Sequence, residues 1–157
     1  MRVALYQPDQ AGNVGAVLRL GACLGVGVDV VRPCGFPVSA NSLLAERDCR
    51  RSAMDYAADV RVHDDWDAFK AAAIGRIVLL TTRGETGIHD FTFRSDDTLL
   101  MGSESAGVPA SVRAEADAAV RIPIAGDARS LNLAVAAGIA LGEALRRTNG
   151  WPGGRTA

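Results

Sequence analysis

Patterns typical of strands alternate with patterns typical of helices along this chain, and this alternation restricts the fold more than any other feature. Short apolar runs predict strands over residues 3–6, 28–31, 60–62, 76–82, 98–102 and 120–124. Apolar residues at helical spacing predict helices over residues 13–24, 42–51 and 130–147, and a further helix that starts at 64–67. The alternation indicates an α/β fold, in which helices flank a single, mostly parallel sheet.

Length and apolar content fit one domain. The chain has 157 residues and is 48% apolar, which is enough to bury a single core. We expect one domain over residues 1–150 and a short tail over 151–157. No apolar run approaches the roughly 20 residues of a membrane span, and Met1–Asp9 becomes polar too soon for a signal peptide. We therefore expect a cytoplasmic protein.

Cysteine spacing and net charge limit the classes of site and partner. Cys23, Cys34 and Cys49 have the spacing of neither a zinc site nor a disulfide framework, so we expect no bound metal. The net charge of −1 argues mildly against a nucleic-acid partner. All but one of the 17 basic residues are arginines, which bind phosphate well, although a GC-rich genome also explains such a composition. Arginine therefore counts as evidence only within a motif.

The histidines and the acidic pairs form no catalytic pattern. His63 and His89 stand apart from the motifs below, and neither pairs with a Ser or Cys nucleophile, so both are expected at the surface. The acidic pairs at 64–65 and 96–97 are expected to cap elements and to face solvent.

The first candidate motif is Asn13-x-Gly15-x-x-x-Arg19, directly after the first predicted strand. Asn13 is suited to cap the helix, and Arg19, nearly two turns later, can share a broad face with it. A capped surface helix with a solvated arginine explains the same residues. Ligands of parallel sheets bind beyond the carboxyl ends of strands, which directs attention to the loops after Tyr6, Leu80, Met101 and Ile124.

The second motif, over residues 99–109, is an apolar strand that runs into a glycine-rich turn. Gly102 and Gly107 lack Cβ atoms, so a flat ligand can lie against the backbone. Glu104 is placed to accept hydrogen bonds or to hold a cation. A turn with a solvated glutamate is the alternative interpretation.

The third motif covers residues 122–143. Ser130 stands where a helix N-cap belongs, and Asn132 lies in the first turn and can project from the same end. Gly138 and Gly142 each destabilise a helix by about 1 kcal/mol relative to alanine, so we expect another backbone to pack closely there. A close-packed core helix without a catalytic role explains the glycines equally well.

In their order and spacing, the three motifs together resemble those of the SpoU-type branch of the SPOUT superfamily, the knotted 2′-O-ribose methyltransferases. The resemblance covers about residues 2–150. It is closest to the small subgroup that methylates cytidine or uridine 34, the wobble nucleotide of tRNA, to which segments 54–56 and 80–84 are also similar. It implies S-adenosylmethionine as cofactor, the tRNA anticodon loop as substrate, a homodimer, and a trefoil knot in the C-terminal third.

The resemblance implies two overlapping sets of site residues. The cofactor-binding set is Leu80, Thr81, Gly102, Ser103, Glu104, Gly107, Ile122, Ile124, Ser130 and Leu131. The catalytic and RNA-binding set is Asn13, Arg19, Glu104, Ser130 and Asn132. Because the pKa of a guanidinium lies above about 12, we expect Arg19 to clamp a phosphate and lower the pKa of the 2′-hydroxyl instead of removing its proton.

Two departures from the subgroup bear on RNA recognition. Gly142-Glu143 stand where the subgroup often has an aromatic pair, and residues 10–12 replace a more proline-rich stretch. One alternative is the same chemistry at another position of tRNA or in ribosomal RNA. A second alternative is a noncatalytic α/β module that binds a nucleotide. A dimer that pools its arginines would offset the low net charge.

Overall fold

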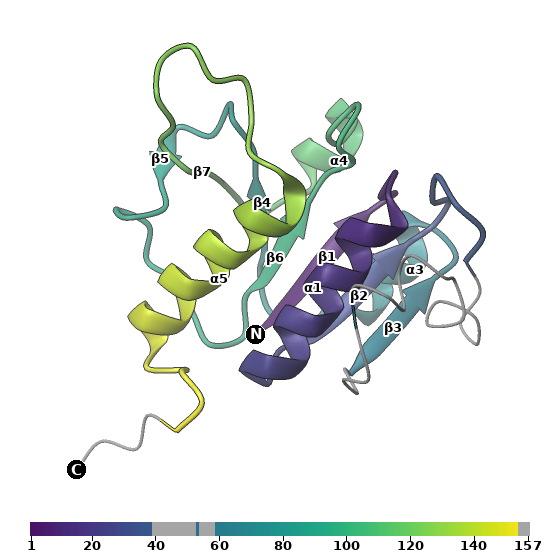
Figure 1. The fold of residues 1–157 in the computed structure, drawn as a ribbon, viewed down its shortest axis with the longest axis horizontal. Coiled ribbons are helices and arrows are strands. Elements are labelled where there is room, and N and C mark those ends of the chain that lie inside the picture. The colour runs from purple at the N-terminus through teal and green to yellow at the C-terminus, as the bar shows by residue number, and fades with distance from the viewer. Residues whose placement is uncertain (39–52, 54–58, 154–157) are drawn as a thin grey trace.

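The computed structural model describes residues 1–38, 53 and 59–153 (Figure 1). Its centre is a seven-stranded sheet in the order β3-β2-β1-β6-β4-β7-β5. The strands are β1 (Arg2–Tyr6), β2 (Gly27–Val31), β3 (Val60–His63), β4 (Ile77–Leu80), β5 (Thr86–Gly87), β6 (Thr98–Met101) and β7 (Ala118–Arg121). Each pair of neighbours in this order is parallel, which confirms the predicted α/β class and its parallel sheet.

The register of the central strands brings their carboxyl ends to one level. Met101 at the end of β6 lies opposite Leu5 of β1 on one side and Leu80 of β4 on the other. Val120 of β7 lies opposite Leu80 in turn. The loops that follow these strands therefore leave the sheet at the edge where parallel sheets bind their ligands.

Helices cover both faces of the sheet and give it two apolar layers. The helices are α1 (Ala11–Leu24), α3 (Trp66–Ala72), α4 (Ala110–Ala114) and α5 (Leu133–Thr148). α1 and α5 pack side by side on one face (Figure 1) and form one core with the sheet. Phe69 of α3 and Val112 of α4 belong to a second core on the opposite face. The predicted placement of helices around the sheet is thus confirmed.

Several boundaries differ from the predicted ones. β7 covers residues 118–121 where a strand over 120–124 is predicted, and α5 starts at Leu133, not at Ser130. β5 and α4 are too short to carry a periodic apolar pattern, so the sequence gives no signal for them. The helix predicted over 42–51 and the segment 54–56 lie outside the described residues. Within the described ranges, no helix has the length and apolar character needed to cross a membrane.

Among the described residues of one chain, the predicted backbone contact at the α5 glycines is not found. A Cβ atom at Gly138 would lie 3.9 Å from Leu20 Cδ2, and one at Gly142 would lie 3.8 Å from the ring of Trp151. Both neighbours are side chains, and no described backbone outside α5 itself comes that near. Val135 and Ile139 on the same helix are also exposed, by 51% and 42%. α5 thus presents an uncovered strip of small and apolar residues.

Two polar residues expected at the surface are buried. His63 packs edge-on against Phe69, and its Nε2 lies 2.7 Å from Asp29 Oδ1. Asp97 is fully buried and accepts hydrogen bonds from Arg76 Nε at 2.9 Å and Arg76 Nη2 at 2.8 Å. Specific hydrogen-bond partners satisfy both groups, and such long-range partners leave no local pattern in the sequence. The predictions for His89, which is exposed, and for Asp65, which caps α3, are confirmed.

The Asp97 cluster provides a test of what holds the start of β6. Asp97 Oδ2 also accepts the Arg94 N–H at 2.7 Å, and the hydrogen bond from Arg76 raises the pKa of that guanidinium. Asp97→Ala leaves these donors without an acceptor, so we expect it to reduce the free energy of unfolding by about 3–5 kcal/mol. Urea denaturation measures the change. Asp96→Ala, at the exposed neighbouring carboxylate, is the control and should stay within about 0.5 kcal/mol; equal losses would contradict the role of Asp97.

Candidate active site

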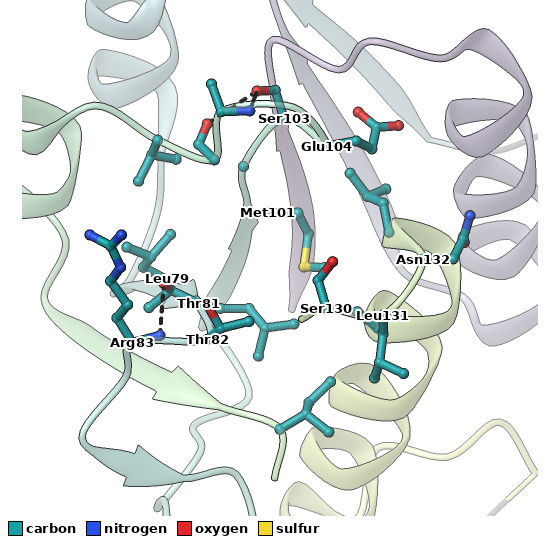
Figure 2. A pocket seen from close by; sticks show the side chains of 18 of the residues that line it. Leu79, Thr81, Thr82, Arg83, Met101, Ser103, Glu104, Ser130, Leu131 and Asn132 are labelled. Atoms are coloured by element: carbon teal, nitrogen blue, oxygen red, sulfur yellow. Dashed lines mark hydrogen bonds between the residues drawn. The ribbon is translucent and has the colours of Figure 1, made fainter. Parts of the chain in front are cut away.

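One cavity of about 890 Å³ opens at the carboxyl edge of the sheet. The loops after β4, β6 and β7 line it together with the beginnings of α1 and α5 (Figure 2). Leu79, Met101 and Val108 form an apolar part of its wall. Its volume lies within the range of sites that enclose small organic ligands, roughly 300–1,000 Å³.

Nearly all the residues that the sequence singles out meet in this cavity. Those that line it are Asn13, Leu80, Thr81, Gly102, Ser103, Glu104, Gly107, Ile122, Ile124, Ser130, Leu131 and Asn132. Arg19 does not line it. A separation of six residues turns a helix through about 600°, which is 120° short of two full turns. Arg19 is exposed on α1, and within one chain the cavity does not bring it together with Asn13.

The loop after β6 is a tight turn that depends on two glycines. Ser103 N donates to Gly107 O at 3.1 Å, and Gly107 N donates to Ser103 O at 2.9 Å. Gly107 has φ of +68°, a conformation that favours glycine. A Cβ atom at Gly102 would lie 2.5 Å from the carbonyl carbon of Gly107. Both glycines are thus required for the turn itself, which also explains the open backbone beside the cavity.

A chain of side-chain hydrogen bonds connects the three motifs at one side of the cavity. Asn132 Nδ2 donates to Asn13 Oδ1 at 3.0 Å, across 119 residues of sequence. Asn13 Nδ2 donates in turn to Glu104 Oε1 at 2.8 Å. The first turns of α1 and α5 and the loop after β6 are therefore tied together by polar groups that line the same cavity. Figure 2 shows two of them, Glu104 and Asn132, on the same side.

Helix α5 sets the direction of this chain of hydrogen bonds. Asn132 Oδ1 accepts the first N–H groups of α5, from Ala134 at 2.9 Å and Val135 at 3.3 Å. The Asn132 oxygen is thus committed to the helix, so its NH₂ group faces Asn13. Asn13 must then present its oxygen to Asn132 and its own NH₂ group to Glu104. A backbone cap therefore orients both amides for any ligand that reaches them.

The same contacts show why two predicted helix caps are wrong. Asn13 lies within the first turn of α1, where Glu104 and Asn132 engage its side chain, and Gln10 is the N-cap residue without a side-chain bond. α5 is capped by Asn132, not by Ser130, because α5 begins at Leu133. Ser130 is exposed in the preceding loop and lines the cavity.

Asp9 holds the Glu104 loop against the end of β1, and sequence reasoning missed it. The Asp9 N–H donates to Glu104 Oε2 at 2.9 Å, and Asp9 Oδ2 accepts the Ser105 N–H at 2.8 Å. Both oxygens of Glu104 are thereby engaged as acceptors, in line with the hydrogen-bonding role expected for that residue. The only signal for Asp9 is its place just after a predicted strand.

The loop after β4 closes the cavity from the other side. Thr81 N donates to Val120 O at 2.9 Å, and Thr81 Oγ1 accepts the Arg83 N–H at 3.3 Å. A Cβ atom at Gly84 would lie 2.5 Å from the carbonyl carbon of Val120. The loop therefore lies directly on β7, and this contact directs Thr81 and Arg83 to the cavity.

Sequence reasoning also missed part of the lining. These residues are Gln10, Leu79, Thr82, Arg83, Met101, Ala106, Val108, Ala110, Arg113, Leu133 and Ala136. Many of these residues are immediate neighbours of predicted ones in the sequence. Arg83 lies in the loop after a predicted strand, so its position at a strand end could have indicated it. Arg113 lies on the short helix α4, for which the sequence has no periodic signal.

Comparison with known proteins gives a consistent result. The model of the SpoU rRNA Methylase family matches residues 1–142. A tRNA (cytidine(34)-2′-O)-methyltransferase of Beijerinckia indica subsp. indica is 52% identical over 150 residues, which are 92% of this chain and 90% of the relative.

Two solved structures extend the comparison to the fold. One, which concerns 2′-OH methylation of C/U34 on tRNA, has a TM-score of 0.85 at 39% identity and covers 93% of this chain and 94% of its own. The other is an AdoMet-bound rRNA methyltransferase from Sinorhizobium meliloti with a TM-score of 0.73 at 33% identity. It covers 92% of this chain and 55% of the longer relative.

Asn132 and Ser130, which both precede α5, allow a matched test of which residue caps this helix. Asn132→Ala removes the N-cap and the contact with Asn13, so we expect the free energy of unfolding to fall by about 1–2 kcal/mol. Ser130→Ala removes an exposed hydroxyl and should change it by less than about 0.5 kcal/mol. Thermal and urea unfolding measure both. The reverse order of effects would contradict the assignment of the cap.

Proposed function

The chain belongs to the SpoU rRNA methylase family, and from this membership we propose that it methylates the ribose 2′-hydroxyl of nucleotide 34 in tRNA with S-adenosylmethionine. The observation that carries the proposal is the meeting of three distant loops in one cavity, with Asn13, Glu104 and Asn132 joined at its side. The choice of nucleotide 34 is supported by the similarity, over nearly the whole chain, to a relative named for that reaction.

The residues of the cavity fit the cofactor. An apolar wall and a glycine-rich turn without Cβ atoms suit a flat adenosine group, and the volume suffices for the whole molecule. When bound, the cofactor supplies a methyl group activated by a positively charged sulfur. The residues that would hold it are Leu80, Thr81, Gly102, Ser103, Glu104, Gly107, Ile122, Ile124, Ser130 and Leu131.

The polar side of the cavity would position the ribose. The amides of Asn13 and Asn132 have fixed directions, and Ser130 stands next to them, so these side chains can orient a hydroxyl group without rearrangement. Glu104 holds Asn13 in place. Arg19 would clamp the phosphate beside the ribose with its forked guanidinium and lower the pKa of the 2′-hydroxyl.

We propose that the active unit is a homodimer in which Arg19 acts on the cavity of the partner subunit. Two observations support this arrangement. Arg19 is exposed on α1 and does not line the cavity of its own chain. α5, which packs beside α1, leaves Val135 and Ile139 exposed beside two glycines, a surface that a second copy would cover. A dimer would also pool arginines for the RNA backbone.

Membership of the same family also supports proposals on domain extent, cell compartment and chain path. We propose one methyltransferase domain over residues 1–150 with a short tail over 151–157, in the cytoplasm, where tRNA is modified. We also propose the trefoil knot of the superfamily. It is supported by the path of the chain, in which the segment 122–132 leads from β7 into α5 and α5 packs against α1 and β6 (Figure 1).

One departure from the subgroup has a structural consequence for RNA recognition. Glu143 accepts hydrogen bonds from Arg146 at 2.8 and 2.9 Å and from Arg147 at 2.8 Å, which lowers its pKa to about 2. The carboxylate thus stays charged and paired with neighbours on its own helix. Gln10, from the other departing segment, lines the cavity. The second segment is therefore the nearer of the two to the proposed reaction.

A transfer assay tests the proposal directly. Incubation with methyl-labelled S-adenosylmethionine and bulk tRNA should place label in a 2′-O-methylnucleoside at position 34, mapped by nuclease digestion and mass spectrometry. Label at another position or in ribosomal RNA would replace the target but keep the chemistry. Cofactor binding without any transfer would favour a noncatalytic nucleotide-binding module.

Mixed dimers test the proposed role of Arg19. Arg19→Ala should lower turnover by about 100-fold or more with cofactor affinity nearly intact, and Asn132→Ala should also be impaired. Co-expression of the two variants should restore activity, because one pocket of each mixed dimer combines an intact Asn132 with Arg19 of the partner subunit. Arg61→Ala, exposed on the edge strand β3, is the control. Inactive mixed dimers, or a monomeric active protein, would contradict the arrangement.

A further inference from the structure

The charged residues of the cavity are unevenly distributed. Among the described residues that line it, Glu104 is the one acidic side chain, and Arg83 and Arg113 are the basic ones. Glu104 lies on the side of α1 and α5, where Asp9 N and Asn13 Nδ2 already engage both of its oxygens. Figure 2 shows Arg83 on the opposite side of the cavity from Glu104 and Asn132. The two sides of the cavity therefore differ in charge.

The two arginines belong to neighbouring elements. Arg83 follows β4, and Arg113 lies on α4, which leads into β7, the strand paired with β4. Arg113 faces the cavity together with Ala110, one turn earlier, while Val112 between them is buried in the core. The burial of Val112 fixes the rotation of α4 and so directs Arg113 to the cavity.

Neither guanidinium is neutralised within the described part of the chain. The ion pairs formed there by arginines involve Arg2, Arg32, Arg76, Arg146 and Arg147, and none involves Arg83 or Arg113. Arg83 contributes only its backbone N–H to a hydrogen bond, with Thr81. A guanidinium has a rigid fork of donors that matches the two oxygens of a carboxylate or a phosphate. Two such groups in the lining of one cavity, with Arg83 on the side opposite Glu104, are suited to an anionic ligand.

We propose that Arg83 and Arg113 bind an oxyanion of a substrate in the cavity, either the carboxylate of the cofactor or a phosphate of the RNA. The inference rests on the proposed function, since it assumes that these two molecules meet there. It adds two binding residues to the cavity, of which Arg83 lies on the side opposite Glu104 and Asn132. The reacting groups would then be held between a polar, oriented side and a cationic side.

Binding measurements on the full-length protein separate the two sources of the anion. The variants are Arg83→Gln, Arg113→Gln and the double change, with Arg94→Gln as the matched control, because Arg94 is exposed and does not line the cavity. Calorimetry gives the affinity for S-adenosylmethionine and for 5′-methylthioadenosine, which lacks the carboxylate. Filter binding over a range of salt concentrations gives the affinity for tRNA.

Two results would support the inference. If the carboxylate is bound, the double variant loses about 10-fold or more in affinity for S-adenosylmethionine and none for 5′-methylthioadenosine. If a phosphate is bound, cofactor affinity is kept, tRNA affinity falls by about 10-fold, and the slope of log affinity against log salt falls by about 1 per lost contact. In either case Arg94→Gln behaves as the wild type.

Other results would overturn it. An active wild type whose double variant binds cofactor and tRNA unchanged would refute the oxyanion site and leave the proposed function intact. Equal loss of S-adenosylmethionine and 5′-methylthioadenosine would show damage to the pocket and no anion contact. A wild type that neither binds the cofactor nor transfers a methyl group would remove the proposed function, and this inference with it.

Discussion

The site depends first on the common level at which the central parallel strands end. Leu5, Met101 and Leu80 lie opposite one another in register, so the chain leaves β1, β6 and β4 at the same edge. Backbone hydrogen bonds within the sheet fix this register, and a slip by one residue would turn every side chain of a strand to the other face. The sheet thereby supplies a rigid base on which segments far apart in sequence meet within hydrogen-bonding distance.

The need to cap the N-terminus of α5 orients the polar groups of the site. The first N–H groups of α5 need an acceptor, and Asn132 provides it. That commitment decides which atom Asn132 offers to Asn13, and therefore which atom Asn13 offers to Glu104. Stability and the proposed chemistry thus share the same side chains. Such sharing preorganises a site, because its groups need not reorient when a ligand arrives.

Sequence reasoning succeeded where a signal is local and periodic. The strands and the long helices follow from apolar spacing, and the strand ends direct attention to the loops that line the cavity. The individual cavity residues, Asn13 to Asn132, follow from the resemblance of the three motifs to a known family. The errors concern contacts between distant segments. Nothing near Asn13 in sequence indicates that Glu104 would engage it, and nothing near Asp97 indicates burial against Arg76. In the proposed dimer, the reach of Arg19 would depend on assembly, which no single-chain pattern contains.

The hydrogen bond between Asn132 and Asn13 joins two parts of the chain that the ribosome makes at different times. These residues are 119 positions apart, and Asn132 directly precedes α5. As a nascent chain emerges from the ribosome, β1, α1 and the central strands become available first. The wall that α5 contributes is missing until residues 132–148 have been made. A nascent polypeptide that stops short of them therefore lacks both the Asn132 contact and one side of the cavity.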